Sequence, residues 1–143
     1  MLAFLKDLYG NRHHELLCVD LGCGDCAYGY ALLKNGVDCR VLGIDTCDSM
    51  LDTGCGNANY THEKLVFIRA SATHLPLATN SVDVVFAVNL FHHLDMQEQI
   101  LAFNEVVRVL RSGGYFFLHE INIKNPIFRF YIRHIFPKTR GID

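Results

Sequence analysis

Two glycines one residue apart follow a short apolar run near the start of the chain and could bring a main-chain loop close to a ligand. The stretch CVDLGCGDCAYGYALLKNG, residues 18–36, places Asp20 near the end of the apolar run and Gly22 and Gly24 after it. Glycine has no Cβ to block a ligand, and it adopts backbone angles that other residues avoid. A loop of this kind between a strand and a helix is typical of nucleotide-cofactor sites.

An acidic residue stands at the distance from this loop at which dinucleotide-binding proteins hold a ribose. Asp45 ends a second apolar run, 21 residues after Gly24. Gly22, Gly24 and Ala27 match the G-x-G-x-x-G/A fingerprint of dinucleotide-binding proteins, and Asp45 is the acidic residue expected after it. A NAD-binding oxidoreductase is therefore one interpretation of the loop, and a tight turn that only joins a helix to a strand is another.

Histidine side chains are the other candidates for chemistry. Imidazole titrates near neutral pH and can accept a proton, so His93 and His119 are candidate catalytic residues. His92 and Glu120 stand beside them in the sequence. Adjacent residues of a helix point in different directions, and no carboxylate triad joins the histidine pair, so we expect no metal site here.

The residues named so far must be positioned by an alternating α/β chain. Short apolar runs predict five strands, over residues 16–21, 39–45, 64–70, 81–91 and 115–121. Asp25 predicts the N-cap of a helix that stops at Gly36, a short helix begins at Asp48, and a last helix covers 126–136. Strands that alternate with helices indicate a parallel sheet with right-handed crossovers.

The helix between the fourth and fifth strands has the clearest boundaries. Asp95 and Glu98 form a D-x-x-E capping box, and the pair Gly113-Gly114 ends the helix. Four apolar residues are expected on one face: Ile100, Phe103, Val107 and Leu110.

A chain of 143 residues fits one domain, and we expect residues 1–143 to form it. Ligands of such sheets bind at the carboxyl ends of the strands, near the point where the strand order reverses. The residues expected around that crevice are Gly22, Gly24, Asp45, Ser71, Asn89 and Glu120.

Four segments in order resemble the class I S-adenosylmethionine-dependent methyltransferases: VDLGCGDC, LGIDTCDSML, ASATHLPLATNSVDVVFAVNLFHHL and EVVRVLRSGGYFFLHE. The last two have no counterpart in the dinucleotide fingerprint, which favours this family over the oxidoreductase. The resemblance runs from Leu16 to Glu120. It implies a three-layer, Rossmann-like, doubly wound sheet with parallel strands in the order 3-2-1-4-5. It also implies methyl transfer from S-adenosylmethionine to a small-molecule acceptor, with S-adenosylhomocysteine as product.

The resemblance further implies which residues contact the cofactor. Asp20 would lie near its amino group, Asp45 would accept bonds from the ribose hydroxyls, and Met50 would pack on the adenine or serve as a core methionine. The whole implied set is Asp20, Gly22, Cys23, Gly24, Asp45, Thr46, Met50, Ser71, Ala72 and Asn89.

Several features depart from the family. Cys26 stands where a third glycine is frequent, and Ser71 where an aspartate is frequent. The two antiparallel strands that usually close the sheet are missing, because only 22 residues follow Ile121. A cofactor-binding fragment or pseudoenzyme without turnover is therefore the alternative function. The fifth strand would be an edge through which the chain could self-associate.

Composition narrows the possible partners. The net charge of −2 gives no indication of nucleic acid binding, and no apolar run is long enough to span a membrane, so we expect a cytoplasmic protein. The basic, aromatic segment 126–136 would dock on the sheet or contact an anionic membrane or lipid-like acceptor. Six cysteines within the first 55 residues are expected to be reduced thiols, several of them buried.

Overall fold

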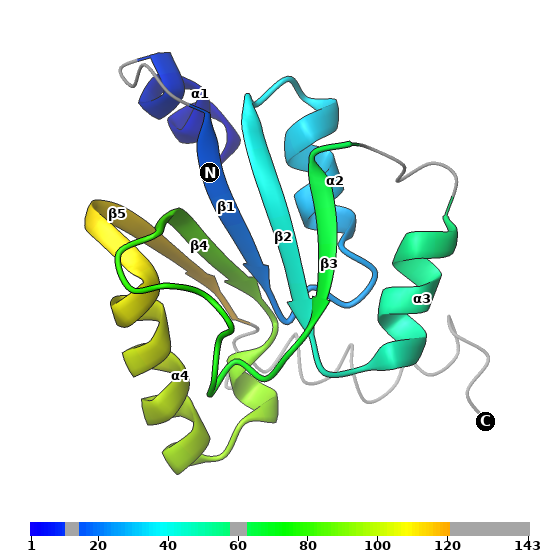
Figure 1. Ribbon diagram of the computed structural model, residues 1–143, viewed down its shortest axis with the longest axis vertical. Coiled ribbons are helices and arrows are strands. Elements are labelled where there is room, and N and C mark those ends of the chain that lie inside the picture. Colours follow the sequence, from blue (N-terminus) through cyan, green and yellow to red (C-terminus); the bar gives the residue numbers. More distant parts are fainter. Residues whose placement is uncertain (11–14, 58–62, 121–143) are drawn as a thin grey trace, which may run out of the picture.

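The protein is described by a computed structural model that covers residues 1–10, 15–57 and 63–120. A five-stranded sheet forms the middle layer, and helices cover both of its faces (Figure 1). The strands are β1 (Leu16–Leu21), β2 (Cys39–Asp45), β3 (Leu65–Arg69), β4 (Val82–Val88) and β5 (Leu110–His119). All four strand pairings are parallel and the order is β3-β2-β1-β4-β5, so the predicted fold class is confirmed.

The helices are α1 (Leu2–Gly10), α2 (Ala27–Lys34), α3 (Asp48–Gly56) and α4 (Met96–Val109), with a short 3-10 turn, η2, at Phe91–His93. None of the helices in the described ranges is long and apolar enough to cross a membrane. The helix predicted over 126–136 lies outside the described residues.

Two apolar clusters, one on each face of the sheet, form the core. The first includes Leu5 of α1, Leu32 of α2 and Phe86 of β4, and the second includes Val85 of β4 and Val106 of α4. Alternate residues of β4 therefore point into different clusters, as the period of two in a strand requires. The strand is fully covered on both faces, which agrees with the uninterrupted apolar run that predicted a central strand.

One buried carboxylate ties three strands together at their amino ends. Asp83 of β4 accepts a hydrogen bond from the backbone N–H of Leu17 at 2.9 Å. Both of its oxygens also lie 3.1 Å from Nη1 of Arg111 on β5. A charge in the core is tolerated here because it is paired and hydrogen-bonded.

Helix α1 forms over residues 2–10, where no sequence pattern predicted a helix. Phe4 of α1 packs edge-on against Tyr115 and Phe117 of β5, with ring centroids 4.8 and 5.5 Å apart. Leu5 is completely buried. The helix therefore covers one aromatic face of β5.

The predicted apolar face of α4 was wrong. Ile100 and Val107 are 56% and 71% exposed, and the residues that pack on the sheet are Ala102, Val106 and Val109. Two apolar stripes compete on this helix, and the stripe with the smaller side chains lets the helix lie close to the sheet. The predicted capping box of Asp95 and Glu98 is confirmed.

The predicted end of α4 was also wrong. The helix stops at Val109, and β5 begins immediately at Leu110, so the glycine pair Gly113-Gly114 lies within the strand. The pairing of β4 with β5 shifts register between Val82 and Val84, opposite this segment. The glycines accommodate that irregularity and do not end the helix.

Candidate functional site

The glycine loop between β1 and α2 has the backbone that its sequence predicts. Gly22 and Gly24 have φ angles of +69° and +56°, in the left-handed region that favours glycine. A Cβ on Gly22 would lie 2.7 Å from Cδ1 of Leu90. The N–H groups of Gly22 and Cys23 both donate to the carbonyl of Ile44, which fixes the loop to the end of β2.

Asp45 connects the glycine loop to the loop that follows β2. Its Oδ2 accepts a hydrogen bond from the N–H of Gly24 at 2.8 Å, and its Oδ1 accepts one from the N–H of Cys47 at 2.9 Å. Each carboxylate oxygen has a further lone pair, so the side chain can still accept bonds from a ligand hydroxyl.

A narrow crevice of about 70 Å³ opens beside Asp45. Its walls come from the ends of β1, β2 and β3 and from the segment after β4; the lining residues are Gly22, Ile44, Asp45, Thr46, Ala70, Ser71, Ala72, Leu90 and Leu94. Five residues of the implied cofactor set are thus brought together: Gly22, Asp45, Thr46, Ser71 and Ala72.

The other implied residues lie around the crevice without lining it. Met50 of α3 covers the glycine loop, because its Cε is 3.2 Å from the place of a Cβ on Gly24. The sulfur of Cys23 is turned towards the sheet and lies 3.0 Å from the place of a Cβ on Gly43. The side chain of Cys23 therefore packs on the sheet, and only its backbone can face a ligand.

Asp20 is placed beneath the helix rather than at the surface of the crevice. It is 1% exposed, and its Oδ2 accepts hydrogen bonds from the N–H of Gly29 at 3.0 Å and from the thiol of Cys26 at 3.5 Å. Burial raises the pKa of Asp20 to about 7, although these two hydrogen bonds act in the opposite direction. The carboxylate holds the first turn of α2 against β1.

The predicted N-cap of α2 was wrong by one residue. Cys26 is the N-cap, in the left-handed conformation with φ of 61°, and its side chain makes no capping bond. Asp25 accepts a hydrogen bond from the N–H of Ala27 at 3.2 Å. The buried Asp20 supplies the bond to the third helical residue that an N-cap side chain would ordinarily make.

Asn89, directly after β4, has an unsatisfied polar atom. Its φ is +57°, and its N–H donates to the carbonyl of His119 at 2.9 Å. Its Oδ1 is buried and has no hydrogen-bond partner within the described part of the chain. A buried acceptor without a partner is costly unless a ligand satisfies it, and the cationic amino group of S-adenosylmethionine is a donor of the required kind.

The wall of the crevice around Ser71 is held by α4. Glu105 accepts a hydrogen bond from the N–H of Leu75 at 2.6 Å, and Arg108 donates to the carbonyls of Leu75 and Leu77 at 2.9 and 2.7 Å. Glu105 and Arg108 are also paired with each other at 2.6 Å. This pair lowers the pKa of Glu105 to about 2, mainly through the hydrogen bond from Arg108.

The histidines are divided between two places. His92 Nδ1 lies 2.8 Å from Oε2 of Glu120, whose Oε1 accepts the N–H of Phe91 at 2.7 Å. Burial alone would raise the pKa of Glu120, but these hydrogen bonds lower it. The ring of His93 lies against that of His92 at a tilt of 42°, with centroids 4.0 Å apart. The link between His92 and Glu120 was missed, because 28 residues separate them in the sequence.

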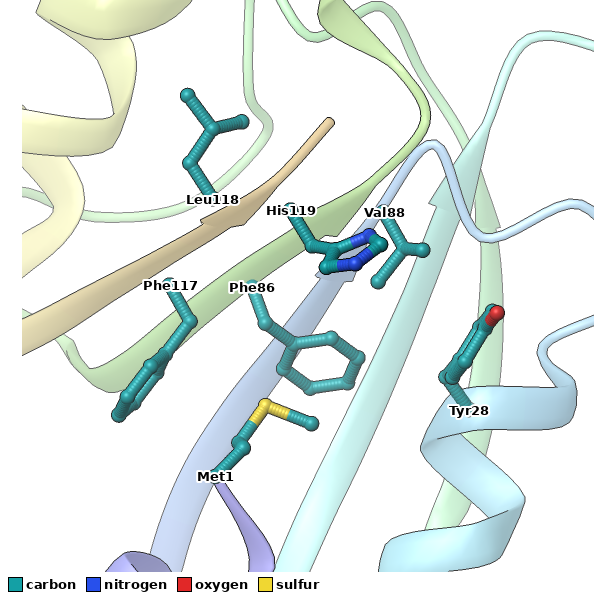
Figure 2. Close-up of a pocket in the computed structure, with 7 residues that line it drawn as sticks. All are labelled: Met1, Tyr28, Phe86, Val88, Phe117, Leu118 and His119. Carbon is teal, nitrogen blue, oxygen red and sulfur yellow. The ribbon is translucent and has the colours of Figure 1, made fainter. Parts of the chain in front are cut away.

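His119 lines a second, larger cavity of about 410 Å³ at the carboxyl ends of β4 and β5. Its walls are Met1, Tyr28, Phe86, Val88, Phe117, Leu118 and His119 (Figure 2). This cavity could not be predicted from the sequence, because its residues come from α2, β4, β5 and Met1, which only the fold brings together. Among the described residues, no group of three or more His, Cys, Asp or Glu side chains is arranged to hold a metal ion.

Sequence comparison identifies proteins that are similar to this chain. Residues 19–118 match the profile of a family described as "Methyltransferase domain". The chain is 27% identical to an uncharacterized chloroplastic methyltransferase of Arabidopsis thaliana, over 99% of this chain and 43% of that protein. It is also 27% identical to the ubiquinone/menaquinone biosynthesis C-methyltransferase UbiE of Syntrophotalea carbinolica, over 99% of this chain and 60% of that protein. The chain spans about half the length of these relatives.

Solved structures give the same result. A putative S-adenosyl-L-methionine-dependent methyltransferase of Methanococcus maripaludis superposes with a TM-score of 0.72 at 19% identity, over 98% of this chain and 66% of that one. Phosphoethanolamine N-methyltransferase 1 of Haemonchus contortus, in complex with phosphoethanolamine and S-adenosylhomocysteine, superposes with a TM-score of 0.64 at 27% identity, over 81% of this chain and 25% of that one. Since the family profile covers most of the chain and the sheet has the strand order of these folds, the chain belongs to the class I S-adenosylmethionine-dependent methyltransferases.

Proposed function

We propose that this chain binds S-adenosylmethionine in the crevice beside Asp45 and transfers its methyl group to a small-molecule acceptor. The observation that carries the proposal is the bond between Asp45 and the N–H of Gly24, because it joins the two loops that class I methyltransferases use for the cofactor. The relatives support a small acceptor, since UbiE is named for quinone biosynthesis and another relative is the sterol 24-C-methyltransferase of Schizosaccharomyces pombe.

The residues present fit the cofactor. Asp45 would accept the ribose hydroxyls, and Ser71 and Ala72 would lie along the adenine with Met50 above the loop. The unpartnered Oδ1 of Asn89 would accept from the amino group. S-adenosylmethionine supplies an already activated methyl group when bound, so the chain has to align the acceptor and exclude water.

Calorimetric titration tests the proposal. We expect S-adenosylhomocysteine to bind the 143-residue chain with one site, and NAD to show no binding under the same conditions. Binding of NAD alone would contradict the proposal, since the glycine loop and Asp45 also satisfy the dinucleotide fingerprint.

The second candidate function is cofactor binding without turnover. Cys26 and Ser71, which stand where the family frequently has glycine and aspartate, support it. A chain that binds S-adenosylhomocysteine but methylates no acceptor would favour it. The cytoplasmic location, self-association through β5 and lipid contact through 126–136 stay predictions.

A further inference from the structure

The cavity at the ends of β4 and β5 adjoins the cofactor crevice. Val88, the last residue of β4, lines the cavity, and Leu90, two residues later, lines the crevice. Tyr28, on the other side of the cavity, is the second residue of α2 and follows the glycine loop closely. Residues two apart in a chain are separated by no more than about 7 Å. Because the cavity is lined by Phe86 and Phe117 of the first cluster and the crevice by Ile44 and Leu90 of the second, the two open at the same edge of the sheet from its two faces.

The chemistry of the lining selects the occupant. Three aromatic rings face the cavity from three elements: Tyr28, Phe86 and Phe117 (Figure 2). Among the described residues that line the cavity none is an acid, a lysine or an arginine, so these residues offer a charged occupant no partner for the hydration that it would lose. Flat aromatic rings pack well against other rings, and a volume of about 410 Å³ is within the range of small-molecule sites.

Of the described lining residues, His119 is the one whose side chain carries a ring nitrogen that can act as a proton acceptor. It ends β5 opposite Val88 in the strand pairing, and its ring projects towards the cavity (Figure 2). An amine acceptor would enter as a cation and would find no carboxylate among the cavity walls that the structure describes. An acceptor with an aromatic hydroxyl can enter neutral and give its proton to the imidazole.

Resting on the proposed function, we propose that this cavity binds an uncharged aromatic acceptor with a ring hydroxyl, such as a phenol or naphthol, and that His119 accepts its proton. As the hydroxyl oxygen takes the methyl group, the O–H proton passes to the imidazole of His119. The electron pair of the broken carbon–sulfur bond stays on sulfur. The products are an aryl methyl ether, a thioether and a protonated imidazole that returns its proton to water.

Calorimetric titration with 2-naphthol tests the binding site. We expect 2-naphthol to bind the 143-residue chain both with and without S-adenosylhomocysteine, and naphthalene-2-sulfonate, with the same rings and a fixed charge, to bind more than tenfold more weakly. Tyr28 is half exposed, so we expect the variant Tyr28→Ala to keep its fold. The variant should bind 2-naphthol about tenfold more weakly than the parent chain. Tyr30→Ala, on the same helix but outside the cavity lining, is the matched control and should bind as the parent chain does.

The outcomes separate the two proposals. If S-adenosylhomocysteine binds but 2-naphthol does not, or if the sulfonate binds equally well, the cavity assignment is wrong and the proposed function stands. If S-adenosylhomocysteine fails to bind, the proposed function is wrong, and the titrations without it still decide the cavity.

Nuclear magnetic resonance tests the role of His119 without turnover. The imidazole ¹⁵N signals of His119 are assigned by their absence in His119→Gln. We expect 2-naphthol to shift them and 2-methoxynaphthalene, which has the rings but no hydroxyl proton, to leave them nearly unchanged. Equal shifts with both compounds would remove the proton-accepting role of His119.

Discussion

The N–H of Gly24 donates to Oδ2 of Asp45 at 2.8 Å, so the residue that ends β2 holds the loop that follows β1. The other oxygen of the same carboxylate accepts the N–H of Cys47 at 2.9 Å. Asp45 therefore shapes the crevice and also faces its occupant.

Asp45→Ala should lower both cofactor affinity and stability. The loss of hydrogen bonds to a charged group costs about 1.5 to 3 kcal/mol of affinity for S-adenosylhomocysteine, and two backbone donors without an acceptor lower the free energy of unfolding by roughly 1 to 3 kcal/mol. Calorimetry and urea unfolding measure the two effects. Asp48→Ala removes only an exposed ion pair with Arg69 and serves as the control. Unchanged affinity in Asp45→Ala would refute the ribose assignment.

Gly22→Ala should abolish cofactor binding, and Gly36→Ala should not. Both glycines have similar positive φ angles, +69° and +73°, so either alanine costs about 1 to 2 kcal/mol of backbone strain. Only the Cβ at position 22 meets a neighbour, Leu90 at 2.7 Å, whereas the one at 36 meets open space. The difference in S-adenosylhomocysteine affinity between the variants isolates the effect of filling the crevice. Equal affinities would mean that the ligand does not approach Gly22.

Asp20 should make the protein less stable as pH rises towards neutrality. Its pKa of about 7 in the folded state exceeds the ordinary value of 3.8, so between these values the folded state holds a proton that the unfolded state has released. The free energy of unfolding should fall by roughly 3 to 4 kcal/mol between pH 4 and 7 and then level off. Urea unfolding of Asp20→Asn should lack this slope. Asp52→Asn, at an exposed position of α3, should retain it.

Glu105 should have the opposite pH dependence in a lower window. Its pKa is lowered from 4.5 to about 2, so the folded state resists protonation, and the stability that the carboxylate provides is lost as pH falls from 4.5 to 2. Thermal unfolding of Glu105→Gln should show a smaller loss over this window than the parent chain. An identical loss of thermal stability between pH 4.5 and 2 in both proteins would mean that the ion pair with Arg108 does not contribute to stability.

The glycine loop, Asp45 and the order of the elements could be predicted because each has a local cause. An apolar run, a glycine spacing and a capping box act within a few residues, and the sheet follows from their alternation. The competing stripes of α4 could not be separated in this way, because Ile100 and Val106 are equally apolar and only the distance to the sheet decides between them.

The parts of the site that were missed depend on contacts between distant residues. The hydrogen bond from Gly29 to Asp20 could not be predicted, because it depends on how closely α2 packs on β1. The cavity around His119 needs α1, which carries no clear sequence signal, and the bond between His92 and Glu120 needs the alignment of two strand ends.

The way α4 holds the crevice wall has a consequence for evolution. Glu105 and Arg108 bind main-chain atoms of Leu75 and Leu77, and every amino acid has a carbonyl group for Arg108 to bind. Exposed residues of this segment, such as His74 and Pro76, can therefore diverge while the path of the chain is kept. Single substitutions at these positions would therefore change the surface next to the crevice residues Ser71 and Ala72, with the backbone of the segment and α4 unchanged.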